Sequence, residues 1–271
     1  MASQDIGNSI RHVIAIASGK GGVGKSTVAA NLALALARTG ARVGVMDADV
    51  YGPSIPTILG VTALPEMDEQ DHIRPVEHEG LKIISMGFFL APEQAVVWRG
   101  PMLHKTMQQF LSGVVWGELE YLIVDLPPGT GDIQLSLCQS IPIAGAVIVS
   151  TPQDVALNVA QKAIAMFKNL NAPVLGLVEN MSDYTCPHCG AHDEILGTGG
   201  AIAMAERLGV RFLGAIPLAS AVRRASDAGR PLVVEAPDSV PARAFSAIAD
   251  AVAGLMCARP EGAETQPQVT F

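Results

Sequence analysis

Two kinds of apolar pattern alternate along the chain. Short continuous apolar runs are typical of strands buried on both faces, and apolar residues at helical spacing are typical of helices that cover a sheet. We expect strands at 12–18, 42–46, 82–86, 121–124, 145–150, 174–178 and 212–216. We expect helices at 26–39, 102–117, 133–140, 155–170, 201–208 and 239–256. Because parallel strands are joined by right-handed crossovers, this alternation predicts an α/β fold with a doubly wound, mostly parallel sheet.

Two stretches interrupt this alternation. Residues 60–80 are acidic and contain prolines, and residues 182–200 contain a pair of cysteines. We expect both to be long surface excursions, which often carry function. We expect a single domain over residues 11–257, preceded by a short extension at 1–10 and followed by a polar, disordered tail at 258–271.

Charge and hydropathy narrow the classes of protein. The net charge of the 271 residues is −8, and the chain lacks the basic cluster that a nucleic-acid binder uses to displace counterions. The mean hydropathy is +0.34, but no apolar run approaches the roughly 18–20 residues of a membrane-spanning helix. The N-terminus has no apolar core like that of a signal peptide. We therefore expect a cytoplasmic protein that binds neither nucleic acid nor membrane.

A glycine-rich stretch carries the strongest chemical signal. Residues 18–27 read SGKGGVGKST, which fits the P-loop spacing between an expected strand and an expected helix. Glycines let backbone N–H groups converge on phosphate oxygens, and the helix N-terminus adds positive potential. We predict that Lys25 reaches the β- and γ-phosphates of ATP, that Ser26 ligates Mg²⁺, and that Thr27 contacts the α-phosphate. The ATP-binding residues expected here are Gly19, Lys20, Gly21, Gly22, Val23, Gly24, Lys25, Ser26 and Thr27.

A second lysine, Lys20, lies inside this loop. Lys25 and the loop backbone already occupy the side that faces the chain's own γ-phosphate. Lys20 is useful if it crosses to a nucleotide on another subunit, as an arginine finger does. The alternative is a solvated loop lysine.

Polar residues follow three of the expected strands, at the end of the sheet where α/β proteins bind ligands. Asp47 and Asp49 are two apart and therefore face the same side, and Asp125 ends the run YLIVD. We predict that Asp49 orients the attacking water and that Asp47 and Asp125 help hold Mg²⁺. The predicted catalytic residues are thus Asp49, Lys20 and Lys25. The carboxamide of Asn180 has one donor and one acceptor, which match adenine N7 and N6; the alternative is an ordinary turn asparagine.

Cys186 and Cys189 form a C-x-x-C pair, two of the four cysteines in the chain. The spacing aims both sulfurs at one metal, but a closed thiolate site needs four ligands. Two chains together would supply four thiolates, enough for a bridging [4Fe–4S] cluster or, as a second choice, Zn²⁺. A one-chain zinc site that includes His192 and a redox-active pair stay open as alternatives. Cys138 is expected in the core, and Cys257 as a free thiol.

The loop KGGVGKST resembles that of the deviant Walker-A P-loop NTPases. The resemblance implies a homodimer that sandwiches two nucleotides, with Lys20 reaching across it and Asn180 on the adenine. The segments DADVYGPS, WRGPM, DLPPGTGD, VENMS and CPHCG resemble, more narrowly, the Mrp/ApbC-type iron–sulfur cluster carrier ATPases over about residues 11–256. Many bacterial members carry an additional N-terminal domain. The motifs do not decide the role of Arg99.

The narrower resemblance implies a function. It is that of an ATP-dependent carrier that binds a labile [4Fe–4S] cluster between two subunits and transfers it from scaffold or donor proteins to client apoproteins, with slow ATP hydrolysis as the switch. The alternative is a MinD/ParA-type positioning or partitioning ATPase with a structural zinc site. The tail ARPEGAETQPQVTF disfavours this alternative, because it lacks a basic amphipathic helix. A nitrogenase iron protein also has a bridging cluster, but its cysteines lie far apart in sequence.

Overall fold

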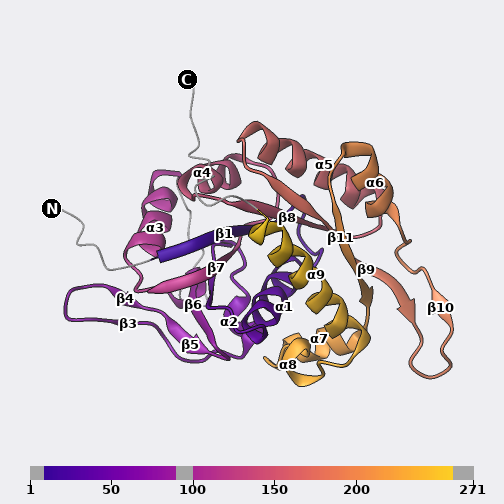
Figure 1. Ribbon diagram of the computed structural model, residues 1–271, viewed down its shortest axis with the longest axis horizontal. Helices are drawn as coiled ribbons and strands as arrows, with labels where there is room; N and C mark the ends of the chain where they lie inside the picture. Colours follow the sequence, from indigo (N-terminus) through magenta and orange to yellow (C-terminus); the bar gives the residue numbers. More distant parts are fainter. Residues whose placement is uncertain (1–8, 90–99, 259–271) are drawn as a thin grey trace.

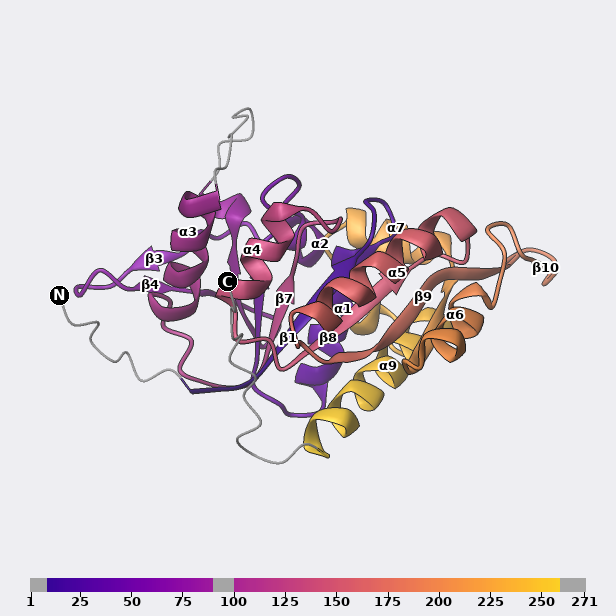
Figure 2. The ribbon, with the colours of Figure 1, turned by 90° about the horizontal axis from the view of Figure 1, so that it is seen from above.

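The computed structural model describes residues 9–89 and 100–258. Within these residues one nine-stranded sheet crosses the molecule, with helices on both faces (Figures 1 and 2). The strands are β1 (Ser9–Ser18), β2 (Val43–Asp47), β3 (Glu66–Met67), β4 (Ile73–Arg74), β5 (Val76–His78), β6 (Leu81–Ser85), β7 (Glu118–Asp125), β8 (Gly145–Ser150), β9 (Val174–Thr185), β10 (His192–Asp193) and β11 (Phe212–Leu218). The helices are α1 (Lys25–Arg38), α2 (Ile55–Leu59), α3 (Gly100–Ser112), α4 (Asp132–Ser140), α5 (Asp154–Asn169), α6 (Gly200–Leu208), α7 (Ser220–Asp227), α8 (Leu232–Glu235) and α9 (Val240–Cys257), with a 3₁₀ turn at Met86–Phe88. The predicted α/β fold with a doubly wound, mostly parallel sheet is confirmed.

The strand order places the carboxyl ends of three central strands side by side. The order is β10-β9-β8-β1-β7-β2-β6-β5, with β11 on the other side of β9. All of these pairs are parallel except β5 with β6 and β9 with β10. In this register Asp47 of β2 lies opposite Asp125 of β7, and Asp125 lies opposite Ile16 of β1. The P-loop after β1 therefore adjoins both carboxylates.

The two faces of the sheet form two separate hydrophobic cores. Along β1, Val13 and Ala15 face the core that includes α3, α4, α5 and α6, while Ile14 and Ile16 face the core that includes α1, α2, α8 and α9. This alternation explains the unbroken apolar run of β1, since both faces of the strand are buried.

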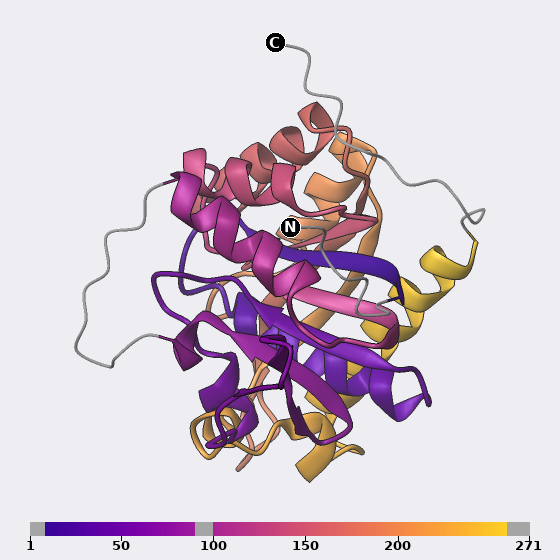
Figure 3. The same cartoon turned by 90° about the vertical axis from the view of Figure 1, so that its left-hand side faces the viewer.

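Several elements differ from the expected pattern. The helix expected to reach residue 117 ends at Ser112, because the following residues pair with Ile73: Val115 N–H donates to Ile73 C=O at 2.9 Å. The stretch 60–80 contains the β3–β4 hairpin and β5 (Figures 1 and 3). The short helices α2, α7 and α8 were not expected. The first strand begins at Ser9, inside the extension expected at 1–10.

The last helix differs from the expectation that no apolar run is long enough to span a membrane. Among the described residues α9 alone is long and apolar enough to cross a membrane by length and composition, so the statement that no run approaches that length is wrong for 240–257. However, Phe245, Ile248 and Val252 of α9 are buried, and the helix packs on α1 and β11. This is the packing of a core helix.

Strand β9, expected to end at Val178, extends to Thr185. Its distal part pairs antiparallel with β10, so that the stretch 182–200 begins as a hairpin rather than as a separate excursion. Figure 1 shows this hairpin projecting from the edge of the molecule. We call residues 182–193 the cysteine arm.

Candidate nucleotide site and cysteine arm

The P-loop joins β1 to α1 in a turn that only glycine can form at two positions. A side chain on Gly19 would begin 2.4 Å from the backbone carbon of Val159 in α5. Gly24, the N-cap of α1, has φ 81° and no side-chain cap hydrogen bond. The first-turn N–H groups of α1 are therefore available to an anion, and the helix dipole favours one there.

Lys25 lies between two strand-end carboxylates in this structure. Its Nζ is 2.7 Å from Asp125 Oδ1, 3.5 Å from Asp49 Oδ2, and 3.3 Å from the Ser26 hydroxyl. Lys25 is 6 % exposed and Asp125 is fully buried. The structure thus brings together four of the predicted site residues from three separate segments.

Asp125 also carries the acceptor that suits a magnesium shell. Its Oδ2 is buried and has no hydrogen-bond partner among the described residues. A buried carboxylate oxygen without a partner is costly, and a metal-bound water would satisfy it. The hydroxyl of Ser26 and Oδ2 of Asp125 therefore fit Mg²⁺, which prefers such oxygen ligands.

Asp47 lies beside this cluster, and both of its oxygens already accept hydrogen bonds. Its Oδ1 accepts from Asp49 N–H at 3.2 Å, and its Oδ2 accepts from Ile55 N–H at 3.1 Å and from the Ser85 hydroxyl at 2.9 Å. Burial, and then the charge of Asp125, raise the pKa of Asp47 to about 7, although these donors oppose the shift. Its predicted role in the magnesium shell stays a prediction, and Asp125 is the better-placed ligand. Ser85 was not predicted, because only the β2–β6 register places it there.

Asp49 holds the loop after β2 as well as contacting Lys25. Its Oδ1 accepts from Tyr51 N–H at 3.2 Å and from Gly52 N–H at 3.3 Å. A phosphate that took over Lys25 would leave Asp49 Oδ2 free to accept from a water. The role of Asp49 in orienting the attacking water stays a prediction.

Lys20 in the P-loop and Thr27 in the first turn of α1 are both half-buried. The backbone carbonyl of Lys20 accepts from the Ser18 hydroxyl at 3.0 Å, and the carbonyl of Thr27 accepts from Asn31 Nδ2 at 2.9 Å. The action of Lys20 on the nucleotide of a second chain stays a prediction.

Asn180 directly follows the part of β9 that pairs with β8, and it lies against the P-loop. Its Nδ2 donates to the Val23 carbonyl at 2.8 Å. The neighbouring Glu179, which was not predicted, is buried and accepts from Gly199 N–H at 3.0 Å and from Ala201 N–H at 2.8 Å. Glu179 thereby caps α6 and fixes the segment that returns from the cysteine arm. The one signal in the sequence for a role of Glu179 is a charged residue directly after the apolar run of the strand.

The two cysteines of the C-x-x-C pair form the tip of the arm. The turn is closed by Cys186 N–H donating to Ala191 C=O and by Gly190 N–H donating to Cys186 C=O, both at 2.9 Å. Cys186 is half-buried and Cys189 is exposed. The backbone amides of His188 and then Cys189 lower the pKa of the Cys186 thiol below its ordinary value. Such a thiol loses its proton to a metal more readily.

No third ligand gathers with this pair. Within the part of the chain that the structure describes, no group of three or more His, Cys, Asp or Glu side chains is placed to hold a metal. His192 pairs through Nδ1 with the Thr185 hydroxyl at 3.2 Å. Burial raises the pKa of the Cys138 thiol to about 12, and Cys257 is exposed at the end of α9. Arg99 lies outside the described residues.

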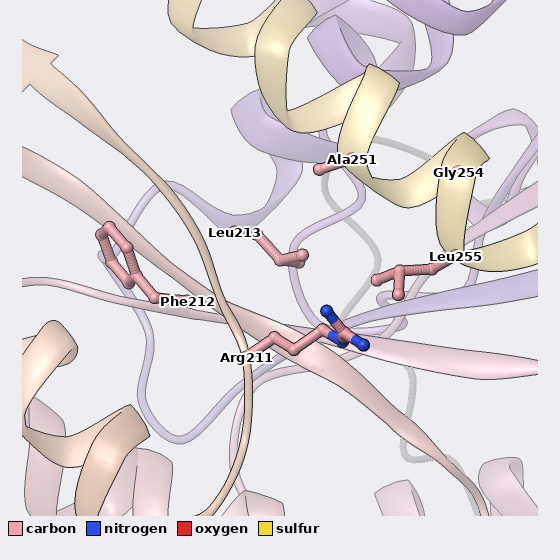
Figure 4. A pocket seen from close by; sticks show the side chains of 6 residues that line it. All are labelled: Arg211, Phe212, Leu213, Ala251, Gly254 and Leu255. Atoms are coloured by element: carbon pink, nitrogen blue, oxygen red, sulfur yellow. The ribbon is translucent and has the colours of Figure 1, made fainter.

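A separate surface hollow lies at the other end of the sheet. It is lined by Arg211, Phe212, Leu213, Ala251, Gly254 and Leu255 (Figure 4). Figure 4 shows the Arg211 guanidinium reaching toward Leu255 across the start of β11. None of the predicted nucleotide or metal residues lines it.

A strand, a glycine-rich loop and a helix that set a lysine against strand-end carboxylates define a P-loop ATPase of the deviant Walker-A class. A family model described as ParA, NUBPL iron-transfer P-loop NTPase, matches residues 9–253. The chain belongs to this family of iron-transfer P-loop NTPases.

Two relatives illustrate the match in sequence. The iron-sulfur cluster carrier protein of Salmonella typhimurium is 50 % identical over 250 residues, which cover 92 % of this chain and 68 % of that protein. The iron-sulfur cluster carrier protein of Deinococcus radiodurans is 52 % identical over 259 residues, which cover 95 % and 73 %. The chain therefore spans about two thirds of the length of these relatives.

Solved structures agree with the fold. A nucleotide-binding protein of Archaeoglobus fulgidus, solved in complex with ADP, is 41 % identical with a TM-score of 0.75, over 85 % of this chain and 90 % of that one. The cell division ATPase MinD of Pyrococcus furiosus has a TM-score of 0.70 over 90 % and 99 %, but only 24 % identity, so it shows the fold alone. The MinD/ParA alternative thus has less support than the iron-transfer family.

Proposed function

We propose that two copies of this chain carry a labile [4Fe–4S] cluster between them and pass it to client apoproteins, with slow ATP hydrolysis as the switch. One observation carries the proposal: Cys186 and Cys189 lie together at an accessible tip, and no third ligand accompanies them among the described residues. The names of the relatives and the iron-transfer family support the cargo.

The twofold arrangement follows from the number of ligands. A [4Fe–4S] cluster is held by four thiolates, and each chain offers two. A site of four thiolates at the accessible ends of two arms leaves the cluster open to incoming thiolates of an apoprotein. Ligand exchange of this kind suits a carrier that releases its cluster. The same exchange in reverse would load the cluster, so we propose scaffold or donor proteins as its source. Zn²⁺ is the less favoured occupant.

The nucleotide chemistry follows from the geometry around Lys25. Phosphate oxygens would replace Asp125 and Asp49 as partners of Lys25, and Asp49 would then orient the attacking water. Mg²⁺, held by Ser26 and Asp125, would neutralise charge on the β- and γ-phosphate oxygens. Lys20 of the second chain would approach the same γ-phosphate. We further propose a cytoplasmic homodimer that needs neither membrane nor nucleic acid.

Anaerobic reconstitution with iron and sulfide tests the proposal. We expect a thiolate-to-iron absorption band and four irons per two chains, with a dimer by size. Changing Cys186 or Cys189 to alanine should abolish cluster retention while the fold and ADP binding persist. The control is Cys257→Ala, which removes another exposed thiol. Full retention in the Cys186→Ala variant, or a metal bound entirely within one chain, would refute the shared site.

A further inference from the structure

The strand β9 contains an unusual joint at Met181, between the nucleotide site and the cysteine arm. Met181 has φ 57°, a left-handed conformation that is rare for a residue other than glycine, asparagine or aspartate. It occurs inside a strand rather than in a turn, with buried Asn180 and Ser182 on either side. A left-handed methionine persists only where the surrounding structure holds it, and such positions cluster at functional sites.

The pairing of β9 with its neighbours changes at the same place. The pairing with β8 ends at Glu179. On the other side, Ile216 and Leu218 of β11 lie opposite Asn180 and Tyr184, so that four steps along β9 match two along β11. The extra residues form a bulge that contains Met181, and bulges bend a strand and re-aim the residues beyond it. The arm therefore leaves the sheet at an angle that this bulge sets.

The joint is held from the nucleotide side. Asn180 donates to the Val23 carbonyl, and a side chain on Gly24 would begin 2.2 Å from Asn180 Nδ2 and 3.6 Å from the Met181 methyl. Two consecutive residues of β9 thus pack on the two P-loop residues that precede Lys25. From Met181 to Cys186 the chain has only five steps: Tyr184 and Thr185 pair with β10, and β9 ends at Thr185, next to Cys186.

We propose that Met181 is a positioning residue through which nucleotide bound at the P-loop sets the angle of the cysteine arm. This inference rests on the proposed function, because that function assigns the cysteine arm its role in holding the cluster. A nucleotide whose adenine engages Asn180 takes that amide from Val23, and the Met181 joint then turns with its neighbour. The rigid left-handed methionine transmits this change, whereas a freely rotating joint would absorb it.

Cysteine reactivity with ADP as the probe tests the joint. ADP presents the adenine but lacks the γ-phosphate that would draw a second chain to the site, so dimerisation does not confound the result. The rate of alkylation of Cys186 and Cys189 is measured by mass spectrometry of their peptide, with and without Mg²⁺ and ADP, on the full chain without metal. In the wild-type protein we expect ADP to change the rate about fivefold or more, within the usual range of coupling between two sites.

Two substitutions at the joint separate its flexibility from its side chain. Met181→Gly adopts φ 57° without strain but also adopts other conformations, so we expect the effect of ADP to fall below about twofold while the affinity for ADP stays within about twofold. Met181→Asn tolerates the left-handed conformation and should keep most of the effect. The matched control is Asn171→Gly, because Asn171 has φ 54° in the turn before β9 and should leave the ADP effect unchanged.

Each outcome of this experiment either supports or overturns the role of Met181. A wild-type ADP effect that survives in Met181→Gly overturns the inference, as does a wild-type protein without any ADP effect. Loss of ADP binding in both Met181 variants also overturns it, because Met181 would then be part of the binding site. Iron retention of the wild-type protein is measured separately: a protein that retains no cluster refutes the proposed function, while ADP-dependent thiol reactivity lost only in Met181→Gly still supports the joint.

Discussion

Replacing Lys25 with methionine tests how the P-loop lysine stabilises the protein in the absence of nucleotide. The substitution keeps a long unbranched side chain and removes the charge. In the structure this charge lies 2.7 Å from Asp125 Oδ1 and 3.5 Å from Asp49 Oδ2. Both carboxylates are at least nine-tenths buried, so water cannot replace the lysine.

The size of the effect follows from leaving buried charge without its partner. Removing one member of a buried ion pair costs about 3–5 kcal/mol, well above the value of an exposed pair. For a domain of this size each kcal/mol lowers Tm by about 2–4 °C, which gives a decrease of about 6–20 °C for Lys25→Met. Contact with a second carboxylate, Asp49, favours the upper part of this range.

The loss of stability in Lys25→Met should depend on pH, and the shifted pKa of Asp125 sets the direction of that dependence. Burial raises the pKa of Asp125, whereas the charge and hydrogen bond of Lys25 lower it; without Lys25 the pKa rises further. Between the ordinary pKa of 3.8 and the raised value, the folded protein binds more protons than the unfolded chain, so stability falls as pH rises. The gap between the variant and the wild type should therefore be smallest at acidic pH and widen once pH rises past the raised pKa of Asp125 in the wild type.

The assay is thermal unfolding without nucleotide at several pH values. The control is Lys20→Met, the same substitution in the same loop, for which no carboxylate within 4 Å is found among the described residues. We expect the control to stay within about 1–2 °C of the wild type, because half-buried Lys20 has no such ion pair to lose. Equal Tm values for the two variants at pH 8, or a gap that does not change with pH, would refute the reasoning.

Three further changes have defined outcomes. Asp49→Asn should bind Mg²⁺ and ATP with affinity close to that of the wild type and slow phosphate release at least about tenfold, measured by steady-state turnover; unchanged turnover would remove Asp49 from its role. Lys20→Ala should leave the free energy of unfolding unchanged but reduce ATP hydrolysis, and a wild-type rate would argue against a lysine acting between subunits. Gly60→Ala should destabilise by about 2–5 kcal/mol in denaturant unfolding, because Gly60 has φ 70° and its added carbon would lie 2.4 Å from Gly229 C=O. Gly40→Ala, at φ 92° with nothing within 4 Å, isolates the conformational part and should cost only about 1–2 kcal/mol.

The fold could be predicted from the sequence because the central strands are buried on both faces. Such strands appear as unbroken apolar runs, and β8 lies at the expected residues. Short elements could not be predicted in this way. Helix α2 has five residues and α8 has four, fewer than a helical period needs to repeat. Their position depends on packing, such as the contact of Gly60 with Gly229, rather than on local pattern.

The candidate site likewise contains residues that local sequence could predict and residues that only the packing of distant segments brings together. The residues of the P-loop act within a few positions of one another, so their spacing alone indicated phosphate binding. The pairing of Lys25 with Asp125 joins residues 100 positions apart, and it depends on β1 and β7 being neighbours in the sheet. Ser85 and Glu179 gave weaker signals still, because each matters only through the element opposite it. A register of strands is needed to find such residues.

The length of β9 also limits how the two halves of the site can influence each other. Asn180 and Cys186 are six residues apart, and a strand rises about 3.3 Å per residue, so an extended β9 places Cys186 about 20 Å from the P-loop contact. Exposed charges are largely screened beyond about 8 Å at physiological salt, so phosphate charge alone has little effect at Cys186 and Cys189. Any influence of nucleotide on the cysteines therefore passes through the chain itself, by β9 or by the returning segment that Glu179 holds, or through a second chain. ADP isolates the first route, and ATP adds the second, because only ATP carries the γ-phosphate that Lys20 would contact across the dimer.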